Sequence, residues 1–202
     1  MRFTIIPNLL LTGMLLLITT TVFADDVSPA IKEKAKVCMG CHGVNGNSTN
    51  GKYPSLAGQK TTYLYSQLKD FMRGRRSDPE MSPMAATIKD KGEALQLAIY
   101  FSSFPPFQYD DTAKNALHLD PAKVEKGRVL VEKVICTMCH GDGLKGMGDV
   151  PRVMGQQPAY IAKQLKAFRD GTRTNDGGTM KGALGSITDE QIADLVQFIT
   201  SQ

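Results

Sequence analysis

Two copies of one pentapeptide, Cys-x-x-Cys-His, use every cysteine of this 202-residue chain. The copies contribute Cys38, Cys41, His42, Cys136, Cys139 and His140. This pentapeptide is the attachment signature of haem c, in which both thiols form thioether bonds to the porphyrin and the histidine reaches the iron. We therefore expect two covalently bound haem c groups, with His42 and His140 as iron ligands.

Two other chemistries use paired cysteines. Four thiolates can hold a structural zinc ion, and a Cys-x-x-Cys pair can form a redox-active disulfide. Neither chemistry requires a histidine after each second cysteine, and neither explains a repeated sequence around each pair. Both are therefore weaker interpretations than haem attachment.

The sequence around the pentapeptides is also repeated. Residues 56–76 match residues 153–173 at a constant offset of 97, and the two pentapeptides lie 98 residues apart. The matched pairs include Gly58/Gly155, Gln59/Gln156, Tyr63/Tyr160, Gln67/Gln164, Phe71/Phe168 and Arg76/Arg173. A repeat of this length indicates a duplicated domain. We expect an N-terminal domain over residues 25–104 and a C-terminal domain over residues 121–202.

Capping signals predict that both domains are helical. They mark four helix starts, at Ser28-Pro29, Asp90, Asp120-Pro121 and Thr188, where Gln191 completes a capping box. Middle helices are expected over 61–73 and 158–170, and no hairpin signal is present. The predicted fold class is all-α.

The segment between the domains, residues 105–120, is predicted to be an ordered linker. It opens with Pro105 and Pro106, which break a helix, and we expect no new helix before Pro121. Its aromatic residues, Phe107 and Tyr109, can pack on the domain surfaces. A flexible tether would be richer in glycine and serine.

Methionine is the best candidate for the second iron ligand in each domain, because its thioether favours ferrous iron and raises the potential. The only histidine outside the pentapeptides, His118, lies in the linker and is expected to be solvated. In the second domain, Met180 follows Cys136 by 44 residues and is the only methionine after Met154.

The first domain offers two methionines, Met81 and Met84. Met81 follows Cys38 by 43 residues, close to the spacing in the second domain, whereas Met84 does not match it. We therefore predict Met81 as the ligand and keep Met84 as the alternative.

Prolines at matching places suggest how the histidines are oriented. Pro54 lies twelve residues after His42, and Pro151 lies eleven residues after His140. A ligating histidine usually donates its other ring nitrogen to a carbonyl or carboxylate, so each proline carbonyl is a candidate acceptor.

Four repeated polar residues are candidates for binding the anionic haem propionates. They are Arg76, Arg173, Gln59 and Gln156. Charge-assisted hydrogen bonds would stabilise such contacts, but the same residues could equally lie on the surface.

The first 24 residues read as a secretory signal. Arg2 precedes an apolar run, and small residues lie at the expected cleavage position after Ala24. A retained membrane anchor is the alternative, although the apolar run is short for a span. Export agrees with haem attachment outside the cytoplasm, so we expect a periplasmic location. The net charge of +4 includes no basic run dense enough for nucleic acid.

Several segments together resemble the dihaem cytochrome c4 family. They are the two pentapeptides, YPSLAGQ at residues 53–59, YLYSQL at 63–68 and MSPM at 81–84. The resemblance implies two tandem class I cytochrome c domains related by pseudo-twofold symmetry, each with histidine and methionine on iron. It also implies a periplasmic carrier of electrons, loosely associated with the membrane. The second domain departs from the pattern, since Met180 has no neighbouring methionine.

These features predict an electron-transfer protein rather than an enzyme. The expected partners are redox proteins: a quinol-oxidising complex as donor and a terminal oxidase as acceptor. One alternative is the electron-accepting dihaem subunit of a periplasmic dehydrogenase, such as a flavocytochrome sulfide dehydrogenase. Another is a haem peroxidase, which would need one iron with a displaceable distal ligand.

Overall fold

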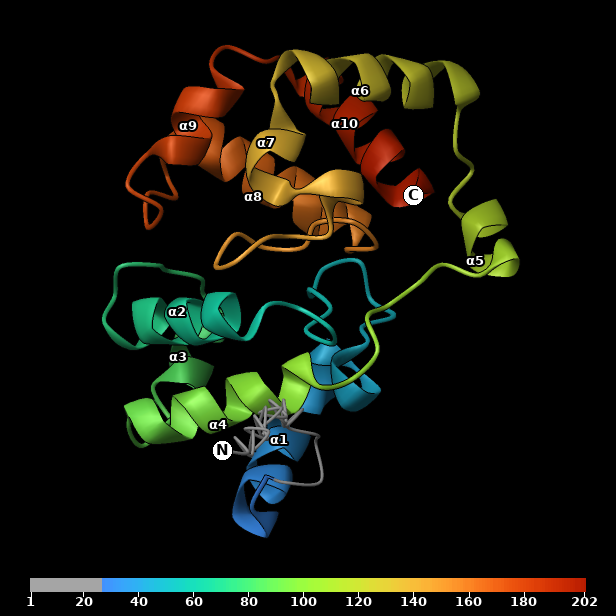
Figure 1. The fold of residues 1–202 in the computed structure, drawn as a ribbon. Coiled ribbons are helices and arrows are strands. Elements are labelled where there is room, and N and C mark those ends of the chain that lie inside the picture. The colour runs from blue at the N-terminus through green and yellow to red at the C-terminus, as the bar shows by residue number, and fades with distance from the viewer. Residues whose placement is uncertain (1–26) are drawn as a thin grey trace, which may run out of the picture.

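A computed structural model describes residues 27–202 of the chain (Figure 1). The expected signal segment, residues 1–24, lies outside the described residues. Residues 27–202 contain helices and no β-strand, apart from one isolated bridge between Met147 and Val150. The predicted all-α fold is therefore confirmed. Within this range no helix is both long and apolar enough to cross a membrane.

The N-terminal domain consists of four α-helices and a 3₁₀ turn. These are α1 (Pro29–His42), η2 (Val44–Gly46), α2 (Thr61–Met72), α3 (Met81–Ala85) and α4 (Lys91–Ser102). The predicted start of α1 is confirmed, since the Ser28 side chain accepts a hydrogen bond from the Ile31 N–H. Asp90 caps α4 in the same way, through the Glu93 N–H.

The C-terminal domain repeats this plan with one interruption. Its elements are α6 (Pro121–Lys133), α7 (Cys136–His140), η3 (Asp142–Leu144), α8 (Pro158–Arg169), α9 (Thr179–Leu184) and α10 (Asp189–Ser201). Asp120 caps α6, and Thr188 forms the predicted capping box with Gln191. The helix that leads into the second pentapeptide is broken at Ile135, whose φ of 53° lies in the left-handed region.

Each domain has its own apolar core. In the C-terminal domain, α6 crosses α10 at Gly127, where a Cβ atom would lie 2.1 Å from the Asp194 carbonyl oxygen and 2.7 Å from the Phe198 Cβ. Glycine is therefore needed at this position for the two helix backbones to meet. On the inner side of α10, Ile192 and Leu195 are almost fully buried.

The linker contains a short helix that was not predicted. This helix, α5 (Asp111–Ala116), lies between the two proline positions. Pro105 and Pro106 precede it and Pro121 follows it, so no proline ring interrupts residues 111–116. The prediction of no helix before Pro121 is therefore wrong.

Upstream of α5, the linker packs on both domains. A Cβ atom at Gly58 would lie 2.6 Å from Pro106, and one at Gly155 would lie 2.6 Å from the Phe107 carbonyl oxygen. Both glycines have positive φ, 63° and 70°. The Tyr109 ring meets the Phe107 ring edge to face, and its hydroxyl donates to the Gln156 carbonyl at 3.4 Å.

The two domains are stacked one on the other, with the linker running along one side (Figure 1). Helix α2 of the N-terminal domain and the loops around α7 and α8 of the C-terminal domain face each other across the stack.

Candidate haem-binding site

A single cavity of about 820 Å³ extends through both domains. All eight residues predicted as haem attachments or iron ligands line it: Cys38, Cys41, His42, Met81, Cys136, Cys139, His140 and Met180. Met84 lines the same cavity but is 38% exposed, whereas Met81 is partly buried. The fold therefore brings together residues that are up to 142 positions apart in sequence.

Both histidines are held by the carbonyls that their sequence positions predicted. His42 Nδ1 lies 2.8 Å from the Pro54 oxygen, and His140 Nδ1 lies 2.8 Å from the Pro151 oxygen. Each Nδ1–H donates to its proline carbonyl, so Nε2 is the nitrogen left for a metal. Burial lowers the pKa of both histidines, although the carbonyl bond opposes this shift. The neutral imidazole is the form that binds iron.

The four cysteines are unpaired. In the described part of the chain no three His, Cys, Asp or Glu side chains are grouped to hold a metal ion. Burial raises the pKa of the Cys38 and Cys136 thiols. One thiol of each pair is exposed and its neighbour is half-buried at the cavity wall.

Aspartates anchor the two methionine segments, and sequence reasoning missed them. The Met81 N–H donates to Asp78 Oδ1 at 3.0 Å, and the Met180 N–H donates to Asp176 Oδ2 at 2.6 Å. An aspartate three or four residues before each methionine was the available signal, because aspartate commonly accepts hydrogen bonds from nearby backbone N–H groups.

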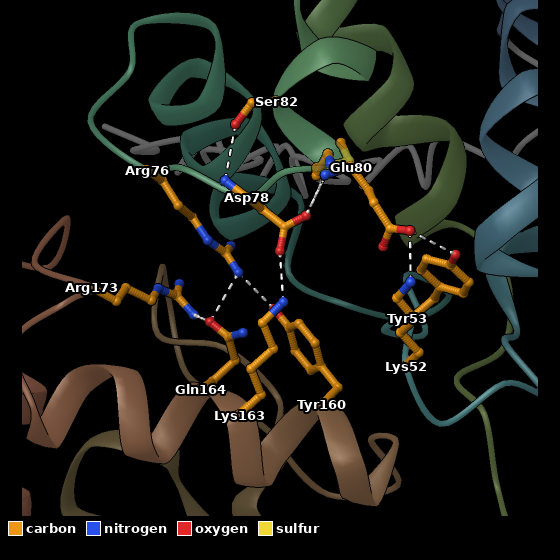
Figure 2. Close-up of polar contacts among 11 residues, drawn as sticks. Lys52, Tyr53, Arg76, Asp78, Glu80, Ser82, Tyr160, Lys163, Gln164 and Arg173 are labelled. Atoms are coloured by element: carbon orange, nitrogen blue, oxygen red, sulfur yellow. Dashed lines mark hydrogen bonds and ion pairs between the residues drawn. The ribbon is translucent and has the colours of Figure 1, made fainter.

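The Met81 segment is also tied to the C-terminal domain. Lys163 on α8 forms an ion pair with Asp78 at 2.7 Å (Figure 2). Burial acts to raise the pKa of Asp78, but the Lys163 bond and two backbone N–H bonds outweigh it and lower that pKa to about 2. Asp78 is therefore ionised while it orients the Met81 backbone.

A second cross-domain cluster surrounds two arginines. Arg76 Nη2 donates to the Tyr160 hydroxyl at 2.9 Å and to Gln164 Oε1 at 3.2 Å (Figure 2). The C-terminal domain returns the same arrangement, because Arg173 Nη2 donates to the Tyr63 hydroxyl at 3.1 Å and to Gln67 Oε1 at 2.9 Å. Equivalent residues thus exchange equivalent contacts, as pseudo-twofold symmetry requires.

This cluster is positively charged and lines the cavity. Burial acts to raise the pKa of Tyr160, but the nearby Arg76 and Arg173 guanidiniums outweigh it and lower that pKa. In the contacts above, both guanidiniums are bound by neutral hydroxyl and amide groups. A buried and a half-buried guanidinium at the wall of this cavity suit the carboxylates of haem propionates, so this part of the site fits the cofactor.

The two glutamines differ from the sequence expectation. Gln59 and Gln156 are buried and line the cavity, but their carboxamides are bound to backbone groups of the opposite domain. Gln59 pairs with Arg152, and Gln156 pairs with Ser55, each through two hydrogen bonds. The repeat revealed that the two positions are equivalent, but it contained no information about their cross-domain partners.

The site as a whole fits two haem groups, because paired thiols, an oriented histidine and a methionine from each domain line the cavity and cations lie at the domain junction. A helical fold that presents this set twice defines a duplicated c-type cytochrome. A family model described as cytochrome c matches residues 31–117 and again residues 124–202, and the chain carries two covalently bound haem c groups.

Comparison with known proteins narrows the family. Cytochrome c4 of Pseudomonas aeruginosa is 34% identical over 198 residues, which cover 95% of this chain and 98% of that protein. The crystal structure of reduced recombinant cytochrome c4 from Pseudomonas stutzeri superposes with a TM-score of 0.74 at 34% identity, covering 84% of this chain and 95% of the other. The chain belongs to the cytochrome c4 family.

A further relative is named for the enzyme from which it accepts electrons. The thiosulfate dehydrogenase electron acceptor of Thiomonas intermedia is 35% identical over 184 residues, which cover 86% of this chain and 82% of that protein.

Proposed function

We propose that His42 and Met81 ligate one haem iron and that His140 and Met180 ligate the other. The observation that supports this most directly is that all four side chains line one cavity while both histidines are already oriented by carbonyls. Met81 is preferred to Met84 because it is the less exposed of the two and its backbone is held by Asp78.

Haem with two protein ligands supplies one-electron exchange and offers no open position for a substrate. The residues of the chain then have three tasks: to hold each porphyrin, to fix the ligand geometry and to exclude water. Residues of both domains line one shared cavity, which supports electron transfer within the molecule. These features favour a carrier over an enzyme such as a peroxidase.

We propose that the protein works in the periplasm and carries electrons between respiratory-chain components, from a quinol-oxidising complex towards a terminal oxidase. The signal-like residues 1–24 and the chemistry of thioether attachment support this location. The two domains of the protein span residues 25–104 and 121–202, and residues 105–120 join them. Contact with these partners is compatible with peripheral association at the membrane.

A second candidate function is electron acceptance from a periplasmic dehydrogenase. The relative in Thiomonas intermedia is named as the electron acceptor of thiosulfate dehydrogenase, which makes a sulfur-compound dehydrogenase the donor to test first. Both candidates use the same haem site and differ in the protein that reduces it.

Stopped-flow mixing distinguishes the two. Oxidised holoprotein is mixed with membranes of its host plus a quinol, or with a thiosulfate dehydrogenase plus thiosulfate, and haem reduction is followed optically. The carrier proposal predicts fast reduction by quinol-supplied membranes and reoxidation when oxygen is admitted. Fast reduction by the dehydrogenase alone would favour the second candidate.

A further inference from the structure

One peptide unit connects the first haem ligand to the opposite domain. The Pro54 carbonyl accepts from His42 Nδ1 at 2.8 Å, and the N–H of the same peptide unit, which belongs to Ser55, donates to Gln156 Oε1 at 2.7 Å. The imidazole, the peptide and the carboxamide therefore form a continuous hydrogen-bonded chain that crosses the domain boundary.

The second ligand has the mirror arrangement. The Pro151 carbonyl accepts from His140 Nδ1 at 2.8 Å, and the following N–H, that of Arg152, donates to Gln59 Oε1 at 2.8 Å. Each histidine thus ends a chain that begins at a glutamine of the other domain.

The glutamines are fixed in this orientation. Gln156 Nε2 donates to the Ser55 carbonyl at 2.9 Å, and Gln59 Nε2 donates to the Arg152 carbonyl at 2.7 Å. With Gln59 6% exposed and Gln156 8% exposed, water competes little for these groups. Exchanging the amide oxygen and nitrogen would place donor against donor and acceptor against acceptor, so the pairing defines which atom faces the peptide N–H.

Hydrogen bonds in series polarise one another, by about 10–30% per bond in condensed phase. An acceptor on the Ser55 N–H makes the Pro54 carbonyl a stronger acceptor for His42 Nδ1–H. Outer partners of this kind increase the basicity of a ligating histidine, and a more basic ligand favours ferric over ferrous iron. The chain should therefore lower the potential of the haem at its end.

We propose that Gln156 is a positioning residue that tunes the haem of the N-terminal domain, and that Gln59 does the same for the haem of the C-terminal domain. Each domain thereby sets part of the other's reduction potential. The inference rests on the proposed ligation of iron by His42 and His140, and it concerns their tuning rather than their identity.

The test is a pair of apolar variants that remove the carboxamide, Gln156→Leu and Gln59→Leu, studied as holoproteins by spectroelectrochemical titration. Gln156→Leu should raise the potential of the N-terminal haem and leave the C-terminal haem near its original value; Gln59→Leu should do the reverse. Losing this polarisation, about 10–30% of one hydrogen bond, predicts a shift of about two- to tenfold in the ferric-to-ferrous equilibrium of the affected haem. At 59 mV per tenfold this is about 20–60 mV.

Gln157→Leu is the matched control. Gln157 also reaches across the boundary, with Nε2 donating to the Ser48 carbonyl, but it contacts neither histidine-bound peptide through that bond. Its loss should move neither potential. Because Leu at 156 could loosen the domain packing, Gln156→Asn is the second variant: its shorter amide stays polar but falls short of Ser55, and the same rise is expected.

Each haem is assigned by repeating the titrations with Met180→His, which moves the C-terminal potential away from the other. The methionine-to-iron charge-transfer band is recorded for the wild-type protein and for the Gln variants, because it reports ligation separately from potential. Its absence from the wild-type protein would count against the proposed ligands and not against the tuning. With the band intact, unchanged potentials, a shift confined to the variant's own domain, or an equal shift in Gln157→Leu would overturn the inference.

Discussion

At the scale of single residues, the histidine contacts are the same in both domains, whereas the surroundings of the two methionines differ. The paired contacts of His42 and His140 with proline carbonyls are equal in length. The methionine segments are not equivalent: Asp78 precedes its methionine by three residues and is paired with Lys163, whereas Asp176 precedes its methionine by four. Different surroundings for similar ligands predict two different potentials.

Replacing Met81 with alanine should remove the charge-transfer band of one haem and lower its potential by at least about 0.1 V, because axial ligands span about 0.8 V. Met84→Ala is the control and should preserve the band and both potentials. Optical redox titration of the two holoproteins measures both quantities. If Met84→Ala removed the band and Met81→Ala did not, the ligand assignment would have to be exchanged.

At the scale of helices, the close contact of α6 with α10 depends on Gly127. In a helix, alanine is normally more favourable than glycine by about 1 kcal/mol. At this position, however, the added Cβ would collide with the Asp194 carbonyl. Gly127→Ala should therefore destabilise the protein by about 1–3 kcal/mol. Lys126→Ala, at an exposed neighbouring position, should change stability by less than about 0.5 kcal/mol.

Urea unfolding followed by circular dichroism measures both variants. A Gly127→Ala protein as stable as the wild type would mean that α6 and α10 are farther apart than the structure places them.

Local signals predicted helix starts well, since Ser28, Asp120 and Thr188 each cap the helix that follows. They did not predict α5, whose six residues carry no apolar pattern at helical spacing. Nor did they predict the break at Ile135, because a β-branched residue rarely adopts positive φ. Such features are set by tertiary contacts that local sequence does not record.

At the scale of the whole molecule, polar and charged side chains join the two domains. The sequence repeat identified these side chains but did not show which residue each one contacts. Duplication showed that Arg76 and Arg173 are equivalent, and the structure shows that each reaches a tyrosine of the other domain. The linker adds to this junction through Tyr109, which donates to the Gln156 carbonyl.

Tyr109 makes the linker contact sensitive to alkaline pH. Burial raises its pKa from 10.0 to about 12, so the folded protein favours the neutral phenol. The resulting stabilisation is complete below pH 10 and is lost as pH rises towards 12, because the unfolded chain releases this proton first. Comparing urea midpoints at pH 8 and pH 11 should show this loss in the wild type.

Tyr109→Phe is the control for that measurement. It lacks the titrating group, so its midpoint should fall less between the two pH values, and at pH 8 it should be less stable by about 1 kcal/mol for the missing hydrogen bond. An equal alkaline loss in both proteins would assign the effect to other groups.

The most direct test of the whole account is a potential-resolved absorption spectrum of the holoprotein matured in its own host. The account predicts two haems per chain that stay attached after denaturation, two one-electron steps, and a methionine-to-iron band contributed by both haems. A single haem, a chromophore released by denaturation, or one iron without a methionine ligand would contradict it.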